Sequence, residues 1–357
     1  MKGRICKQDN EGLNFDIPRF IIRQSAVLHS SICGSAPSTS HLPPVVADLA
    51  IVTRGLQKTF GSVTAVASLD LDVPRGELFG LIGPDGAGKS TAIRMLCGLI
   101  RPTGGAGQVL GHDLSRNGSR VKARVGYLSQ AFTLYGDLTV DENLAFFGDL
   151  HGVADFRARA EELLAFTRLS PFRERLAADL SGGMKKKLAL ACTLIHDPEL
   201  LLLDEPSTGV DPVSRGEFWS ILSALLERGV TILMTTPYLD EAERCHRVGL
   251  MHAGRVLLTG TPDEVKAAIP GVVFDLVVPD PRGAYACLRQ TWSYANLVLL
   301  GDRVRFWSPV GEPDVASCVA KLEAAGLGPV TRTRAAPTLE DAFIGLLDFS
   351  SREIYCF

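Results

Sequence analysis

The hydrophobic pattern of the chain changes near residue 50. Residues 1–48 are rich in serine and proline and show no apolar period, a composition typical of linkers and disorder. We therefore expect a disordered or non-functional extension there. Apolar and polar residues then alternate over residues 50–56 and 63–73, which predicts half-buried strands.

Strands and helices are predicted to alternate through residues 50–270. Short, mainly apolar runs at residues 200–206 and 231–236 predict buried strands, while residues 90–100 place apolar side chains at helical spacing. Residues 137–176 are mainly helical in pattern. The alternation predicts an α/β domain with a mainly parallel core sheet and a helical subdomain.

A different order of elements begins after residue 270. Residues 271–347 predict a strand, a helix, two strands, a helix and a strand, followed by a last helix. This βαββαβ order is that of small ferredoxin-like domains. We expect a second, α+β domain over residues 271–347 and a short tail over residues 348–357.

Composition narrows the functional classes. The chain has 357 residues, with 37 basic against 40 acidic ones, and its net charge of −3 gives no support for nucleic-acid binding. Its eight cysteines lack metal-ligand or paired spacing, so we expect reduced thiols. No apolar run approaches the roughly 20 residues that span a bilayer. We expect a soluble chain, to which another chain would supply any membrane span.

One segment carries a specific pattern for phosphate binding, GxxxxGK[ST], between a predicted strand and a predicted helix. Its glycines let backbone N–H groups surround phosphate oxygens, and the helix N-terminus adds partial positive charge. Lys89 is predicted to reach the β- and γ-phosphates of ATP, and the Ser90 hydroxyl to bind Mg²⁺. The predicted nucleotide loop comprises Gly83, Pro84, Asp85, Gly86, Ala87, Gly88, Lys89, Ser90 and the following Thr91.

An acidic pair, Asp204 and Glu205, ends the leucine-rich strand. At that position Asp204 can hold Mg²⁺ through water, and Glu205 can polarise an attacking water molecule. Apolar residues followed by two acids are common at strand ends, so the pair gains its significance from the phosphate loop. Together the two motifs predict a nucleoside-triphosphate hydrolysis site.

A second helix start, at Ser181, Gly182 and Gly183, has the composition of an anion-binding terminus. An ordinary serine N-cap explains the same pattern. Because one ATP needs only one phosphate loop, we expect the second terminus to serve an ATP held by another subunit. The adjacent lysines 185–187 are expected to form a solvated helix face rather than a nucleic-acid site.

In their order along the chain, these motifs resemble those of the ATP-binding subunit of ABC transporters. The resemblance covers residues 51–269 and includes the phosphate loop, Gln130 in YLSQ, LSGGM, LLLLDEP and STGVD. It implies a P-loop NTPase nucleotide-binding domain over residues 50–270 that binds ATP and Mg²⁺. It also implies a catalytic role for Lys89.

The resemblance gives roles to further residues. Phe60 is implied to stack on the adenine, and Gln130 to bind Mg²⁺, take part in catalysis and couple to the membrane partner. Glu205 is implied to be the catalytic base. Residues 181–183 are implied to contact the γ-phosphate across a head-to-tail dimer of two cassettes, and Asp211 to link the two sites.

Two segments, residues 136–152 and 337–347, are similar to those of daunorubicin-resistance and ABCA-like proteins, a group of ABC-2 type exporters. The similarity implies a small C-terminal regulatory domain and a drug or lipid-like substrate. The implied partners are an ABC-2 type permease and a second cassette. The permease would hold the chain on the cytoplasmic face of the cell membrane.

Pro237 departs from the family pattern. The family has a histidine there, which contacts the γ-phosphate and holds the attacking water, whereas proline has no such donor. His246 lies nine residues further on and is expected to lie away from the phosphate. Losing one contact is predicted to slow hydrolysis by roughly 10²–10³-fold. Asp85, in place of the commoner asparagine, either disfavours the triphosphate or stiffens the loop by accepting N–H bonds.

The leading hypothesis is therefore an ATP-hydrolysing exporter subunit with a weakened site, similar to the first cassette of two-cassette exporters. Because of Pro237, a non-hydrolysing, ATP-dependent clamp remains an alternative, which turnover would distinguish. A soluble ABC ATPase acting on ribosomes or DNA is a further alternative, but such proteins usually have two cassettes, basic linkers or coiled coils. Whether the partner cassette is identical stays open, although a degenerate site favours an unlike one.

Overall fold

A computed structural model describes residues 48–354, apart from residues 132–133, 270, 293–296 and 309–311. Of the extension predicted over residues 1–48, all but residue 48 lies outside the described residues, as do the last three residues of the predicted tail. None of the helices in the described part is long and apolar enough to cross a bilayer.

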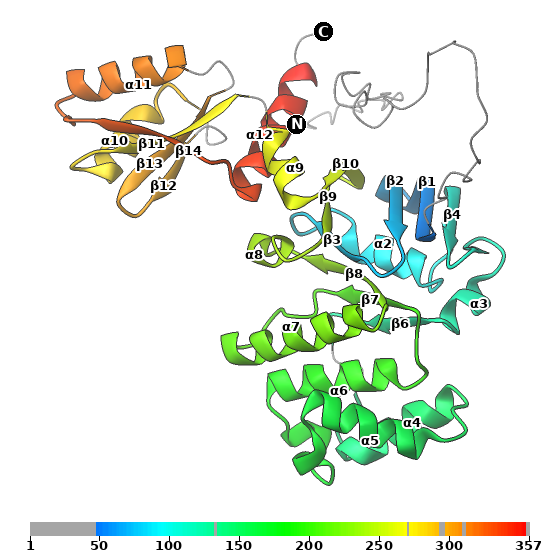
Figure 1. Cartoon of the computed structure of the whole chain (residues 1–357). Coiled ribbons are helices and arrows are strands. Elements are labelled where there is room, and N and C mark those ends of the chain that lie inside the picture. Colours follow the sequence, from blue (N-terminus) through cyan, green and yellow to red (C-terminus); the bar gives the residue numbers. More distant parts are fainter. Residues whose placement is uncertain (1–47, 132–133, 270, 293–296, 309–311, 355–357) are drawn as a thin grey trace, which may run out of the picture. The chain divides into compact units, whose positions relative to one another are not determined.

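A ten-stranded sheet forms the larger part of the fold (Figure 1). Its strands are β1 Leu49–Phe60, β2 Val63–Pro74, β3 Leu78–Ile82, β4 Gly104–Val109, β5 His112–Asp113, β6 Val125–Leu128, β7 Leu200–Asp204, β8 Thr231–Thr236, β9 Arg247–His252 and β10 Arg255–Gly260. Their order is β5-β4-β1-β2-β10-β9-β3-β8-β7-β6. The predicted parallel core is confirmed for β9, β3, β8, β7 and β6. It is extended by β1, β2, β4 and β5, which pair antiparallel.

Some of the helices pack against this sheet, and others form a separate group. They are α2 Lys89–Leu96, α3 Gly118–Lys122, α4 Val140–Leu150, α5 Phe156–Thr167, α6 Gly182–Leu194, α7 Pro212–Glu227, α8 Leu239–Ala242 and α9 Pro262–Ala267, with the 3₁₀ turns η1 Ser170–Phe172 and η2 Ala177–Asp179. Helices α4, α5 and α6 pack against one another, and α6 also contacts α7 and β6. This α4–α6 group is the predicted helical subdomain (Figure 1).

The leucine run of β7 shows why the parallel strands are buried. Leu201 and Leu203 belong to one hydrophobic core, and Leu200 and Leu202 to another, so the run is covered on both faces. All six residues of the neighbouring strand β8 are buried as well. Strands covered on both faces have nearly continuous apolar sequences. Because β3, β8 and β7 are parallel neighbours, their carboxyl ends meet at one edge of the sheet.

A second, four-stranded sheet follows in the chain. Its strands are β11 Val272–Val277, β12 Leu297–Leu300, β13 Arg303–Ser308 and β14 Thr331–Ala335, and they are accompanied by α10 Pro281–Leu288, α11 Glu312–Ala324 and α12 Leu339–Ile354. The sheet order is β12-β13-β11-β14, with antiparallel neighbours throughout. The predicted βαββαβ order and ferredoxin-like α+β fold are confirmed. The last helix extends past its predicted end at residue 347.

Candidate nucleotide site

The phosphate loop lies between the end of β3 and the start of α2. Gly86 and Gly88 have φ angles of 78° and 103°, a region that disfavours other residues. A Cβ atom on Gly83 would lie 2.1 Å from the Met251 carbonyl oxygen, and one on Gly88 would lie 2.4 Å from the Ala65 carbonyl oxygen. Glycine is therefore required at both ends of the loop, whereas its middle is exposed to solvent.

The side chain of Lys89 folds back across this loop. It is 4% exposed, and its Nζ donates hydrogen bonds to the carbonyl oxygens of Gly83, at 2.8 Å, and Pro84, at 3.0 Å. The same ammonium lies 3.7 Å from Oε1 of Glu205. The loop thus holds a buried positive charge beside its exposed turn, as phosphate binding requires.

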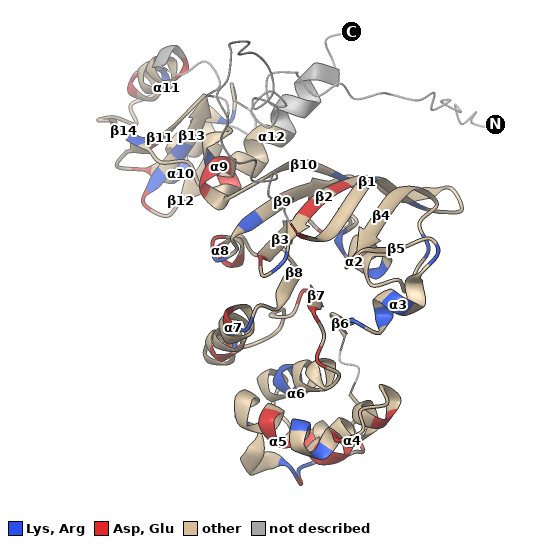
Figure 2. Cartoon of the chain, turned by 45° about the vertical axis from the view of Figure 1, so that its right-hand side comes forward, with Lys and Arg blue, Asp and Glu red and all other residues tan. Residues whose placement is uncertain are grey.

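Asp204, at the end of β7, joins this strand to α2 and β8. Its Oδ1 accepts hydrogen bonds from the hydroxyls of Ser90, at 2.9 Å, and Thr235, at 2.8 Å. Its Oδ2 is buried, and no described residue donates a hydrogen bond to it. A buried carboxylate oxygen with spare bonding capacity beside a serine hydroxyl suits a hard cation such as Mg²⁺. Acidic residues, in red, mark this end of β7 in Figure 2.

Glu205 is held in a strained conformation. Its φ of 48° is in the left-handed region, which is unfavourable for residues other than glycine. Its Oε2 accepts hydrogen bonds from Nε2 of Gln130, at 2.9 Å, and from the Thr208 hydroxyl, at 3.4 Å. Its backbone N–H donates to Oγ1 of Thr235 at 3.0 Å. These contacts fix the carboxylate next to Lys89 and leave the amide oxygen of Gln130 as a possible Mg²⁺ ligand.

Three predicted nucleotide contacts lie near the loop or at a strand end. Phe60, the last residue of β1, is 49% exposed, and Nζ of Lys58 lies 4.9 Å from the centroid of its ring. Thr91 is partly buried in the first turn of α2. Asp85 is exposed in the turn, and no described residue donates a hydrogen bond to its carboxylate. The suggestion that Asp85 stiffens the loop is therefore not supported.

The second predicted anion-binding terminus lies on other elements. The Ser181 hydroxyl caps α6 by accepting a hydrogen bond from Met184 N at 3.3 Å. A Cβ on Gly183 would lie 2.3 Å from the side chain of Ser214 in α7, so these two helix starts are closely packed. Helix α6 packs on α4, α5, α7 and β6, whereas α2 packs on β2, β7 and β8. This terminus therefore begins a helix of the helical subdomain, whereas the phosphate loop leads into a helix that packs on the core sheet.

Asp211 caps the neighbouring helix α7. Its Oδ1 accepts hydrogen bonds from the backbone N–H groups of Val213, at 3.1 Å, and Ser214, at 3.0 Å. Hydrogen bonds from Ser214 and Val213 lower the pKa of the Asp211 carboxyl, so it stays ionised at the exposed start of α7. Asp211 and Ser181 thus form two adjacent, solvent-accessible helix caps.

Pro237 follows the end of β8, where the polar groups form hydrogen bonds with nearby residues. The Thr236 hydroxyl donates to Oε2 of Glu241 at 2.7 Å and accepts from the Tyr238 N–H at 3.0 Å. His246 accepts a hydrogen bond from the N–H of Leu78 at 2.9 Å. Since Leu78 begins β3 and the phosphate loop follows the end of β3, His246 lies at the opposite end of that strand.

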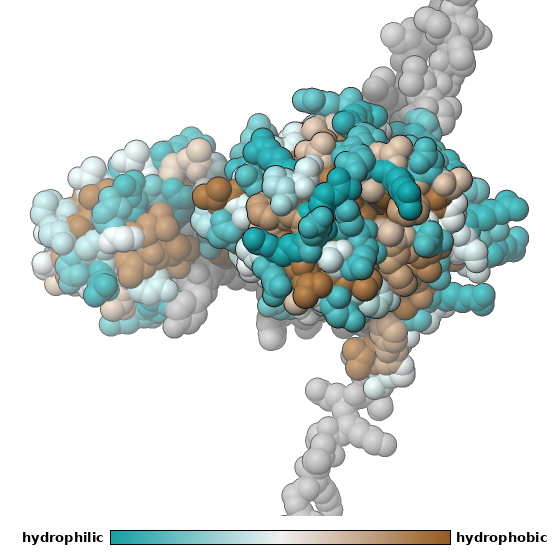
Figure 3. Space-filling model, turned by 90° about the horizontal axis from the view of Figure 1, so that it is seen from below, coloured by the Kyte–Doolittle hydropathy of each residue, from teal (hydrophilic) through white to brown (hydrophobic). Residues whose placement is uncertain are grey.

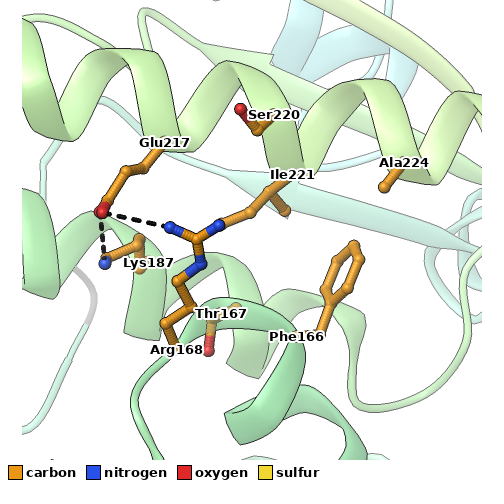
Figure 4. Close-up of a pocket in the computed structure, with 8 residues that line it drawn as sticks. All are labelled: Phe166, Thr167, Arg168, Lys187, Glu217, Ser220, Ile221 and Ala224. Carbon is orange, nitrogen blue, oxygen red and sulfur yellow. Dashed lines mark hydrogen bonds and ion pairs between the residues drawn. The ribbon is translucent and has the colours of Figure 1, made fainter.

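The prediction of a solvated lysine face on α6 is wrong for two of its three residues. Lys186 and Lys187 are 2% and 7% exposed. Nζ of Lys186 donates to the backbone oxygen of Gln130 at 2.9 Å. Nζ of Lys187 lies 2.8 Å from Oε2 of Glu217 (Figure 4). Because other helices and the loop after β6 cover α6, these charges are buried against internal acceptors.

Sequence reasoning missed two side chains that support the acidic pair. Thr235 bonds both Asp204 and Glu205, and Lys186 bonds Gln130. The signal for Thr235 was a hydroxyl near the end of an otherwise apolar strand. Its register opposite Asp204 required the pairing of β7 with β8.

Comparison with known proteins agrees with this geometry. The family model described as ABC transporter matches residues 66–208. The daunorubicin resistance ATP-binding protein DrrA3 of Streptomyces coeruleorubidus is 38% identical over 306 residues, which cover 84% of this chain and 96% of that protein. This chain belongs to the ABC transporter family of ATP-binding proteins. The predicted resemblance to ABC transporter ATP-binding subunits of the daunorubicin-resistance group is thereby confirmed.

Other family members match the nucleotide-binding part. The probable multidrug ABC transporter ATP-binding protein YbhF of Escherichia coli is 44% identical over 220 residues, 61% of this chain and 38% of that protein. The chain thus matches less than half of that relative. A solved structure, described as an ATP binding subunit of an ABC transporter, is 30% identical with a TM-score of 0.56 and covers 61% of this chain and 92% of that one.

Proposed function

We propose that this ABC transporter protein is the ATP-binding and ATP-hydrolysing subunit of an ABC-2 type exporter. The observation that carries the proposal is the convergence of three groups at the carboxyl edge of the parallel strands. Lys89 lies beside Glu205 at 3.7 Å, Gln130 bonds Glu205 at 2.9 Å, and Ser90 bonds Asp204 at 2.9 Å. A phosphate binder, a base and a cation site are thus adjacent.

In the proposed mechanism the loop N–H groups and Lys89 bind the triphosphate. Glu205 accepts a proton from the attacking water, and Gln130 orients its carboxylate. Ser90 and Gln130 would hold Mg²⁺ directly, and Asp204 through water. When bound, Mg²⁺ neutralises charge on the phosphate oxygens.

We further propose that a complete site needs a second cassette. Ser181, Gly182 and Asp211 are exposed at the starts of α6 and α7, whereas the phosphate loop leads into α2. A helix N-terminus that is open to solvent is suited to a phosphate brought by another molecule. A head-to-tail pair of cassettes would place residues 181–183 on the γ-phosphate of the partner and leave Phe60 to stack on the chain's own adenine.

The partner in the membrane is proposed to be an ABC-2 type permease that contacts the helical subdomain. Tyr135, Phe146, Leu150 and Leu176 are between 37% and 64% exposed in this region, and the rings of Tyr135 and Phe146 lie 4.6 Å apart. Figure 3 shows apolar patches among polar residues on the face seen from below. This partner would hold the chain on the cytoplasmic face of the membrane. A drug or lipid-like substrate is proposed because relatives are described as daunorubicin resistance and Nod factor export proteins.

The hydrolytic site is proposed to be weakened at Pro237. Proline supplies no donor, and its neighbours Thr236 and Tyr238 already bond each other. Thr236 also donates to Glu241. Losing one contact to the transferring phosphoryl group slows hydrolysis by roughly 10²–10³-fold. The same observation favours a second candidate function, a clamp that binds ATP without turnover.

The proposal is tested by ATP binding and steady-state hydrolysis of the wild-type chain, of Glu205→Gln and of a control, Glu227→Gln, which changes an exposed glutamate at the end of α7. We expect all three to bind ATP. Glu205→Gln should lower kcat by roughly 10²–10⁴-fold, since it removes the base, and Glu227→Gln should match the wild type. A wild-type chain that binds ATP without turnover would establish the clamp, and one that binds no ATP would refute both functions.

A further inference from the structure

Lys186 is a buried lysine outside the phosphate loop. It lies on α6 and is 2% exposed. Its Nζ donates a hydrogen bond of 2.9 Å to the backbone oxygen of Gln130, in the loop that follows β6. A buried ammonium is unfavourable unless it is hydrogen-bonded or paired. The hydrogen bond to Gln130 therefore helps to make a buried lysine tolerable at this position.

The surroundings of Lys186 connect it to the acidic pair. Burial lowers the pKa of Lys186, while the charges of Asp204 and Glu205 oppose that shift. Helix α6 packs against β6, the strand next to β7, so Lys186 lies on an element adjacent to the strand that leads into the acidic pair.

Gln130 is bonded at both its backbone and its side chain. The backbone oxygen accepts from Lys186, and Nε2 of the side chain donates to Oε2 of Glu205 at 2.9 Å. Two consecutive hydrogen bonds thus run from α6 to the proposed base. The same helix is capped by Ser181, the residue proposed to contact a partner's ATP.

We propose that Lys186 is a positioning residue for hydrolysis: it fixes the backbone of Gln130 so that the Gln130 amide holds Glu205 in its reactive orientation. This inference rests on the proposed function, because it concerns the same base. Its consequence is that the position of α6 is linked to the orientation of Glu205 within one chain. A cassette that contacts the start of α6 can therefore influence hydrolysis in both chains.

Lys187 offers a matched control. It is the next residue on α6, it is also a buried lysine, and its Nζ forms an ion pair with Glu217 at 2.8 Å. That pair lies beside a cavity of about 170 Å³ between α5, α6 and α7 (Figure 4). Arg168, which also lines the cavity, lies 3.6 Å from the same glutamate. Among the described residues, no hydrogen bond or ion pair joins Lys187 to Gln130 or Glu205. It thus separates the loss of a buried lysine from the loss of the bond to Gln130.

The first experiment compares the wild type, Lys186→Met and Lys187→Met in the full chain. Methionine keeps the unbranched apolar part of the lysine side chain but lacks its charge and its donor. We expect Lys186→Met to lower kcat roughly tenfold, the effect of one hydrogen bond from a charged donor, with the KM for ATP changed less than about twofold. Lys187→Met should lower the unfolding midpoint without lowering kcat. Equal kcat values for Lys186→Met and the wild type would overturn the inference.

The second experiment repeats Lys186→Met in a Gln130→Ala background. If Lys186 acts through the Gln130 amide, it should have almost no further effect on kcat once that amide is removed. If the two reductions multiply, Lys186 acts in another way and the inference is wrong. Should Lys186→Met not fold, Lys186→Leu, which also has neither charge nor donor, takes its place in both experiments. A wild-type chain without turnover refutes the proposed hydrolysis itself, whereas an active wild type with an insensitive Lys186 refutes this inference alone.

Discussion

The two strands β7 and β8 are neighbours with the same direction and burial, yet their ends differ. They pair in register from Leu200 opposite Thr231 to Asp204 opposite Thr235, and every residue of both is buried. Strand β7 ends in two carboxylates that face the phosphate loop. Strand β8 ends in two hydroxyls and then Pro237.

The polar groups at the end of β8 support other residues. Thr235 bonds Asp204 and the backbone of Glu205, so this part of β8 supports the acids of β7. Thr236 instead donates to Glu241, at the start of α8. The described polar contacts of β8 thus support neighbouring groups, whereas the proposed reactive groups lie at the ends of β6 and β7 and at the start of α2. A histidine at position 237 would add a reactive group to β8.

The first effect expected from this comparison is at Thr235. Thr235→Val keeps the shape of the side chain but removes both bonds to the acidic pair. We expect kcat to fall by roughly tenfold or more, because hydrogen bonds to charged groups are worth about 1.5–3 kcal/mol. The measurement is steady-state ATP hydrolysis with nucleotide affinity determined in parallel.

Thr236→Val is the matched control, since Thr236 is equally buried and bonds a carboxylate outside the site. It should lower the unfolding midpoint to a similar degree while leaving kcat within about twofold of the wild type. Equal reductions of kcat in the two variants would mean that the two positions do not differ as the geometry indicates.

A smaller effect is expected at the opposite end of β7. Glu199, just before this strand, accepts hydrogen bonds from Arg124, at 2.5 and 2.7 Å, and from Arg75, at 3.0 Å. The hydrogen bond from Arg124, above all, lowers the pKa of Glu199 below its ordinary value of 4.5. A depressed carboxyl pKa stabilises the fold above the ordinary value, and this stability is lost as pH falls through the folded pKa.

Glu199→Gln should therefore lower the unfolding midpoint at pH 7, and the difference from the wild type should shrink below pH 4.5. The expected contribution is below about 1 kcal/mol, because the Glu199 side chain is 40% exposed and solvent screens the pair. Thermal unfolding at several pH values measures it. A difference that persists unchanged at low pH would show that the charge of Glu199 is not its source. The hydrolysis rate at pH 7 should stay the same.

Much of the fold and of the site could be predicted because the patterns have direct physical causes. The leucines of β7 formed a continuous run since both faces of the strand are covered. The glycines of the phosphate loop could be recognised because the loop needs positive φ angles and close backbone contacts, which other residues disfavour. The βαββαβ order followed from periodicity alone. These features are local, so the sequence displays them.

The features that could not be predicted depend on pairing between distant segments. The three lysines of residues 185–187 look alike in the sequence, and only the packing of α6 against other elements shows that two are buried. The position of His246 depends on its bond to Leu78, which is 168 residues away in the chain. The support of Thr235 for Asp204 depends on the register of two strands.

The most direct test of the weakened site is the steady-state ATPase rate of the wild type, Pro237→His and Pro237→Ala. Alanine restores the backbone N–H without an imidazole, so it separates the loss of proline from the gain of a donor. The account predicts a slow wild type, a kcat for Pro237→His that is higher by up to roughly 10²–10³-fold, and little gain for Pro237→Ala. A wild type that already turns over as fast as Pro237→His would contradict it, since another group would then hold the attacking water.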